Sequence, residues 1–124
     1  MFEVVASTEG TITRLGLHGR LDATSSPGLD SKLDALLTAG VRHIVVECAQ
    51  LEYISSAGLR VFLTFAKTLR KRKGQMAFCA MQPIVYQVFE ICEFTDILPI
   101  CQTMEEATAK VREGDHPSRH GRHS

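Results

Sequence analysis

The stretch VRHIVVECAQLEYISSAGLR, residues 41–60, contains the most strand-like segment of the chain, residues 41–49. Residues 50–58 join this segment to an amphipathic helix. Ile44, Val45 and Val46 follow one another without polar interruption, as in a central strand that is covered on both faces. The sequence then takes a helical period: Leu59, Phe62, Leu63, Ala66 and Leu69 share one face, and Arg60, Thr64, Lys67 and Lys71 share the opposite one. A buried strand that leads into a helix favours an α/β fold with a mostly parallel sheet.

The segments before this stretch predict a hairpin and a helix. Residues 2–7 and 11–19 are strand-like and are separated by a turn, so we expect them to pair as an antiparallel hairpin. A helix is predicted over residues 25–40, with Ser26 as N-cap and Pro27 at the first helical position.

The segments after it continue the alternation of strands and helices. Residues 75–80 and 97–101 read as strands, and residues 83–94 as a short helix that Pro83 opens. A last helix over 103–113 begins with Thr103 and Glu106 at capping-box spacing. We therefore expect one α/β domain over residues 1–113, with a mixed, mostly parallel sheet of four or five strands and about four helices. Residues 114–124 have no apolar side chain and are expected to form a disordered tail.

Composition excludes several classes of function. The 124 residues suit one domain, and 14 basic residues balance 14 acidic ones, so nothing in the overall charge predicts binding to nucleic acid. The N-terminus lacks the pattern of a secretion signal, and no apolar run approaches the roughly 20 residues of a membrane helix. We expect a cytoplasmic protein that does not insert into membranes.

Cysteine, histidine and basic residues give weak signals for a site. The four cysteines could form disulfides or hold a metal, but each has apolar neighbours and no C-x-x-C pair occurs, so reduced core thiols are the better interpretation. The tail histidines lack partners suited to a metal site. The basic run at residues 70–73 suits a solvated helix end. No catalytic triad or phosphate-binding loop can be identified, so we expect neither an enzyme nor a cofactor.

Ser55 and Ser56 leave two interpretations open. A serine is a good N-cap, and the helical pattern begins directly after them. Capping needs only one serine, however, and Gly58 costs about 1 kcal/mol in a helix relative to alanine. A small surface at a helix start is where a partner backbone can approach closely and where free N–H groups can receive an anion.

Three stretches of the chain resemble a known family, the STAS domain, named for sulfate transporters and anti-sigma factor antagonists. They are YISSAGLR at residues 53–60, GRLDATSSPGLDSKL at residues 19–33 and FTDILPICQTMEEATAKV at residues 94–111. The resemblance covers about residues 2–113. Stand-alone bacterial members are anti-sigma factor antagonists, so the resemblance implies a role in regulating a sigma factor.

The resemblance also implies a switch by phosphorylation. In such members the unmodified protein binds an anti-sigma factor that is also a serine kinase, and this binding frees the sigma factor. The kinase phosphorylates a serine at the start of the second helix of the antagonist. A metal-dependent serine phosphatase restores the unmodified form. The family motif is commonly Asp-Ser-Ser/Thr-Gly. When this motif is aligned with the chain on Gly58, the modified serine corresponds to Ser56. Ser55 then takes the place of the aspartate, and Ala57 takes the place of the second serine or threonine.

The partner surface implied by the resemblance surrounds Ser56. Its expected residues are Asp22, Thr24, Ser55, Ala57, Gly58, Leu59 and Arg60. A phosphate adds about −1.5 to −2 charges at a positive helix N-terminus, which the fold should tolerate and a docked partner should not. Two other classes stay open: an unmodified scaffold subunit of a signalling or transport complex, and a sensor of a nucleotide or lipid. A weak homodimer is also compatible with the sequence.

Overall fold

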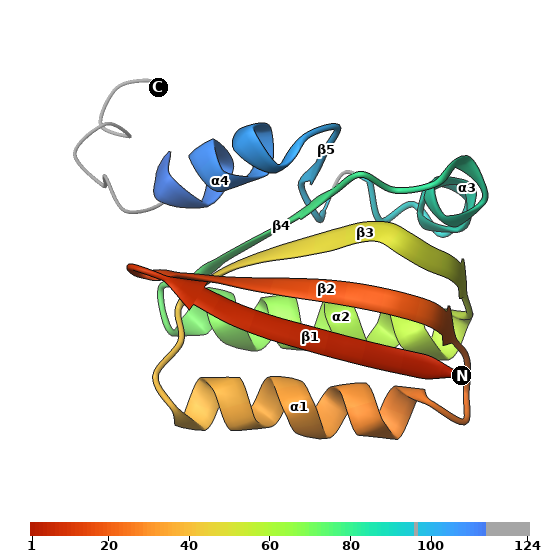
Figure 1. The fold of residues 1–124 in the computed structure, drawn as a ribbon, viewed down its shortest axis with the longest axis horizontal. Helices are drawn as coiled ribbons and strands as arrows, with labels where there is room; N and C mark the ends of the chain where they lie inside the picture. Colours follow the sequence, from red (N-terminus) through yellow and green to blue (C-terminus); the bar gives the residue numbers. More distant parts are fainter. Residues whose placement is uncertain (96, 114–124) are drawn as a thin grey trace.

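The computed structural model describes residues 1–95 and 97–113, and the predicted tail at 114–124 lies outside the described residues. Strands and helices alternate after an initial pair of strands, as the sequence predicts (Figure 1). The elements are β1 (Phe2–Glu9), β2 (Ile12–Leu21), α1 (Ser26–Thr38), β3 (His43–Ile54), α2 (Ser56–Lys71), β4 (Gln75–Cys79), α3 (Pro83–Ile91), β5 (Ile100–Cys101) and α4 (Met104–Glu113).

The described strands form one five-stranded sheet in the order β1-β2-β3-β4-β5. β1 and β2 pair as an antiparallel hairpin, whose turn contains Gly10 at a φ of 63°, a value that glycine adopts without strain. All other neighbouring strands are parallel. The mixed, mostly parallel sheet predicted from the sequence is confirmed.

The helices cover the two faces of the sheet unequally. α1 and α2 lie side by side on one face, α4 lies on the other, and α3 lies at the end of the sheet where α1 and α2 begin (Figure 1). The larger apolar core fills the space under α1 and α2, and a smaller one lies under α4. Phe78 on β4 joins the larger core to both flanking helices, because its ring stacks edge-on with Phe62 of α2 at 5.1 Å and Phe89 of α3 at 5.3 Å.

β3 is longer than the sequence predicts. Residues 50–54 were expected to lie between a strand and a helix, but they continue β3 to Ile54. Leu51 and Ile54 are buried in the core, which requires the chain to stay against the sheet. The pairing with β2 shifts register twice along this part, and such irregularities break the two-residue alternation by which a strand is recognised.

Other boundaries and core positions also differ. α3 ends at Ile91 rather than at residue 94, and β5 contains only Ile100 and Cys101 instead of residues 97–101. On α2, the predicted apolar face is buried except at Leu63, which is half-buried, while Phe65 is buried in addition. The buried face of α2 is therefore rotated slightly from the predicted one.

Candidate functional site

The start of α2 lies beside the loop that leads into α1. Both helices begin at the same edge of the sheet, where β2 and β3 end (Figure 1). The backbone N–H of Ser55 donates to the carbonyl of Leu21 at 2.9 Å, which fixes the end of β3 to the end of β2. The fold thus brings together the two segments, residues 22–25 and 55–60, in which the sequence predicts a partner surface.

Ser55 and Ser56 have different roles. Ser55 is the N-cap of α2: its backbone is extended, and its hydroxyl accepts a hydrogen bond from the backbone N–H of Gly58 at 3.2 Å. Ser56 is the first residue of the helix and is exposed. Within the described residues its hydroxyl makes no hydrogen bond. The capping interpretation therefore applies to Ser55, and the hydroxyl of Ser56 is left accessible.

Gly58 and Leu59 are buried at the base of this surface. Leu59 is 1% exposed and Gly58 is buried. A Cβ atom on Gly58 would lie 2.7 Å from Cγ of Leu21 and 3.2 Å from Cγ1 of Ile54, so glycine is needed for α2 to pack onto the strand ends. Contact of these two residues with a partner stays a prediction. The exposed residues of this surface are Ser56 and Arg60, with the half-buried Ser55 and Ala57 beside them.

The loop before α1 is held by the carboxylate of Asp22. Its Oδ1 accepts hydrogen bonds from the backbone N–H groups of Thr24 and Ser25, each at 3.0 Å, and from the Ser25 hydroxyl at 3.0 Å. The hydrogen bonds from Ser25, backbone first and then side chain, lower the pKa of Asp22 below its ordinary value. Asp22 therefore shapes the loop, and Thr24 is exposed upon it.

Ser26 does not have the predicted capping role. Ser25 occupies the N-cap position of α1, and no side chain forms a capping hydrogen bond there. Ser26 is instead the first helical residue; it is buried, and its hydroxyl donates to the carbonyl of Asp22 at 2.6 Å. Sequence reasoning missed Ser25, whose hydroxyl also accepts from the backbone N–H of Asp22 at 2.9 Å; Ser25 and Ser26 are both residues suited to an N-cap, and the sequence does not distinguish them.

Two hollows flank Ser56. The first, of about 630 Å³, lies between α1 and α2 and is lined by Pro27, Asp30, Ser56 and Arg60 among others. The second, of about 380 Å³, lies between α2 and the segment after α3, and Phe94 lines it together with Ser56 and Arg60. Ser56 and Arg60 line both hollows, so they form the ridge between them. The proximity of the end of α3 to the start of α2 could not be predicted from the local sequence.

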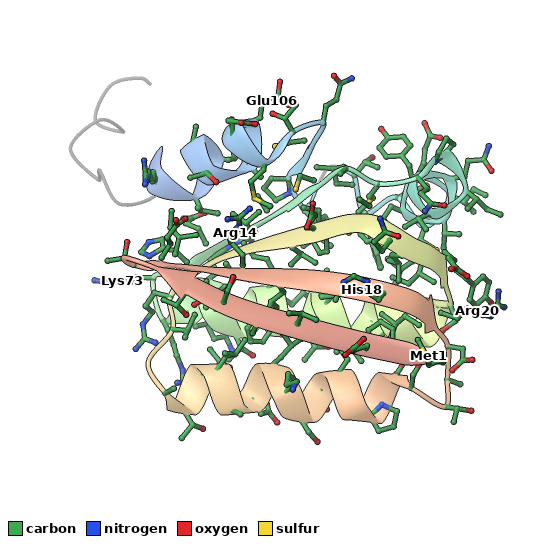
Figure 2. All side chains as sticks on the ribbon, in the orientation of Figure 1. Met1, Arg14, His18, Arg20, Lys73 and Glu106 are labelled. Carbon is green, nitrogen blue, oxygen red and sulfur yellow. The ribbon has the colours of Figure 1, made fainter. Side chains whose placement is uncertain are left out.

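Arg20 and Tyr53 border the same edge of the sheet. They pair across β2 and β3, and the guanidinium of Arg20 lies 4.4 Å from the centre of the Tyr53 ring. Figure 2 shows Arg20 at this end of the molecule and Lys73 at the other. An exposed arginine stacked on a half-buried ring adds a rigid cationic feature beside Ser55, which neither residue indicates alone.

The weaker candidates that the structure describes do not assemble into a site, and the tail histidines lie outside the described residues. No group of three or more His, Cys, Asp or Glu side chains among residues 1–95 and 97–113 could hold a metal ion. All four cysteines are free thiols, and burial raises the pKa of Cys79 to about 11. The run at residues 70–73 is exposed at the end of α2, as predicted. None of the helices in the described residues is long and apolar enough to cross a membrane.

Comparison with known proteins gives consistent results. The family model described as the STAS domain matches residues 3–107. The chain is 40% identical over 96 residues to BtrV of Bordetella bronchiseptica, a candidate anti-sigma factor antagonist, covering 77% of this chain and 83% of BtrV. It has the fold of an anti-sigma factor antagonist from Mycobacterium paratuberculosis, with a TM-score of 0.82, 18% identity and coverage of 90% and 95%.

A further structural neighbour is known in two chemical states. The anti-sigma factor antagonist SpoIIAA has been solved in its unphosphorylated form, and SpoIIAA of Bacillus in its phosphorylated form. Each structure has a TM-score of 0.68 and 20% sequence identity with this chain. Each match covers 90% of this chain, together with 98% of the unphosphorylated SpoIIAA chain and 99% of the phosphorylated one.

Proposed function

Because this chain belongs to the STAS domain family, we propose that it is an anti-sigma factor antagonist whose unmodified form binds an anti-sigma factor serine kinase and so releases a sigma factor. Phosphorylation of Ser56 ends that binding, and a metal-dependent serine phosphatase restores it. The chain is a regulatory binding protein and not an enzyme. The proposal places it in the cytoplasm, where it would meet these partners.

The accessible hydroxyl of Ser56 is the observation that carries this proposal. Because Ser55 supplies the cap of α2, the hydroxyl of Ser56 is not required for the helix to start. Its position in the first turn also favours an added phosphate, since the helix N-terminus carries partial positive charge and free N–H groups. Ser56 can therefore gain charge without loss of the local fold.

The phosphate would act directly on the partner surface. Ser56 lies on the ridge between the two hollows, next to Ala57 and near the loop that Asp22 holds. A partner that packs closely on this ridge leaves no room for a phosphate and would have to desolvate its charge. Asp22, Thr24, Ser55, Ala57 and Arg60 are the proposed contact residues, with Gly58 and Leu59 supporting them from below.

Phosphorylation by the anti-sigma factor kinase of the same genome tests this function. Wild-type protein should accept one phosphate on Ser56, located by phosphopeptide mapping, and should then lose its binding to the kinase. Ser56→Ala should accept none and still bind, because Ser55 keeps the cap. Ser55→Ala is the matched control and should remain a substrate. Full phosphorylation of Ser56→Ala, or equal binding before and after modification, would favour an unmodified scaffold.

A further inference from the structure

The exposed face of α2 carries positive charge only. Its cations are Arg60, Lys67, Arg70, Lys71, Arg72 and Lys73 at its end, and we call these six residues the basic stripe. All six are exposed, and no acidic residue occurs between residues 56 and 73. Arg60, Lys67 and Lys71 are spaced so that they share one face of the helix. Since α2 has 16 residues, the stripe extends about 24 Å along the molecule from Ser56.

No cation of the basic stripe forms an ion pair with another described residue. Among residues 1–95 and 97–113 the single ion pair joins Arg14 and Glu9, which line a hollow together with residues of α4. Asp30 of α1 lines the same hollow as Arg60, but the two do not form an ion pair. The chain as a whole has no net charge, so this concentration on one helix must be matched by acidic residues elsewhere. Positive charge is therefore concentrated along α2.

Helix stability explains only part of the stripe. Arg70 and Lys71 in the last turn interact favourably with the negative end of the helix dipole. Arg60 lies close to the other end, where a cation is unfavourable and where α2 has no acidic residue in its first turn. Lys67 lies between the two ends and gains little from either. A role outside the fold accounts for these two cations better than stability does.

We propose that the basic stripe is a docking surface for an acidic face of the partner protein, an inference that rests on the proposed function and names the chemistry of its partner. The stripe begins at Arg60, which is also a residue of the ridge between the two hollows, so the stripe and the ridge are continuous. Attraction between opposite charges speeds association more than it increases affinity. The stripe thus guides the acidic partner toward the Ser56 ridge.

The same arrangement makes the phosphate a stronger signal. A phosphate on Ser56 would lie one helical turn from Arg60, the spacing at which side chains on a helix interact. It would neutralise the end of the stripe nearest the ridge and repel an acidic partner at that point. Modification would therefore slow association as well as obstruct close packing.

Association kinetics of two charge-reversed variants test the inference. Lys67→Glu/Lys71→Glu reverses two charges of the stripe, and Lys110→Glu/Arg112→Glu makes the same change in net charge on α4, on the opposite face of the sheet. All four side chains are exposed, and far-UV circular dichroism checks the fold. If a charge-reversed protein does not fold, Lys67→Gln/Lys71→Gln gives a smaller effect of the same sign. Stopped-flow mixing with the purified anti-sigma factor measures the association rate constant at several salt concentrations.

The expected result is a rate constant at least about tenfold lower for the α2 variant at low salt, with the α4 variant within about twofold of wild type. The difference should shrink toward about 0.15 M salt, because screening weakens long-range attraction. Equal rates for the two variants would overturn the inference and leave the proposed function intact. Failure of wild-type protein to form any complex would overturn both.

Vesicle binding separates a protein partner from a membrane. A basic helix face can also bind anionic lipid. Wild-type protein is sedimented with vesicles of phosphatidylcholine and phosphatidylglycerol, beside the two charge-reversed variants. Wild-type protein is expected to bind the vesicles no more than the α2 variant does. Binding that is lost only in the α2 variant, together with an unchanged rate toward the anti-sigma factor, would assign the stripe to a membrane and overturn the inference.

Discussion

Replacement of Gly58 by alanine should destabilise the protein, although alanine is the better helix former. Alanine in place of glycine gains about 1 kcal/mol of helix propensity. At this position the new methyl group would lie 2.7 Å from Cγ and 2.9 Å from Cδ2 of Leu21. Leu21 is fully buried and cannot turn away into solvent. Overpacking of this kind costs about 1–3 kcal/mol, so a net loss of about 1 kcal/mol is expected.

Gly28 provides the matched control for this substitution. It also lies in the first turn of a helix, but an added Cβ would meet no atom within 4 Å. Gly28→Ala should therefore stabilise the protein by about 0.4–1 kcal/mol. Urea unfolding followed by far-UV circular dichroism is the suitable assay, because the chain has no tryptophan. If Gly58→Ala is as stable as Gly28→Ala, the ends of β2 and β3 can move to accommodate the added methyl group, and the close-packing argument is wrong.

The loop, the thiols and the helix start each have a further expected outcome. Hydrogen bonds from Ser25 lower the pKa of Asp22, so the carboxylate stabilises the fold above its unfolded pKa, and this stabilisation is lost as the pH falls through the lower folded pKa. The free energies of unfolding of wild type and Asp22→Asn should therefore converge below pH 3.8. A difference between them that stays constant with pH would contradict this prediction. An aromatic disulfide reagent should leave Cys48 and Cys79 unlabelled in native protein and label four thiols after denaturation, whereas rapid native labelling of Cys48 would disprove its burial. Ser56→Asp should fold with stability within about 1 kcal/mol of wild type, since an acidic residue suits a helix N-terminus, while its binding to the kinase in a titration should weaken at least about tenfold.

The order of the elements could be predicted because each has a clear apolar period and clear end signals. Ile44, Val45 and Val46 identify a covered strand, and the apolar stripe of α2 identifies a helix on a sheet. The end of β3 could not be predicted, since its register shifts against β2 interrupt the alternation of apolar and polar residues. Local pattern is thus sufficient for regular elements and insufficient where pairing with a neighbour sets the boundary.

The candidate site was only partly predictable for a related reason. The sequence singles out Ser55 and Ser56 together, but both are good caps, and the choice between them depends on the direction in which the chain leaves β3. The extended backbone of Ser55, with a ψ of 170°, directs its hydroxyl to the N–H of Gly58. The burial of Gly58 depends on Leu21, which is distant in sequence and reaches the site only through the sheet.

The roles of Ser55, Ser56 and Gly58 would confine the effect of an added phosphate to one part of the surface. Under the proposed function, Ser55 maintains the helix start, and Gly58 holds α2 closely against the strand ends. A charge added at Ser56 therefore cannot be relieved by a shift of α2 into the core. The change is confined to the ridge and to the adjoining end of the basic stripe, where the partner would bind. It follows that phosphorylation should alter binding strongly while the stability of the domain changes little, and a large loss of stability in the phosphorylated protein would show that α2 moves instead.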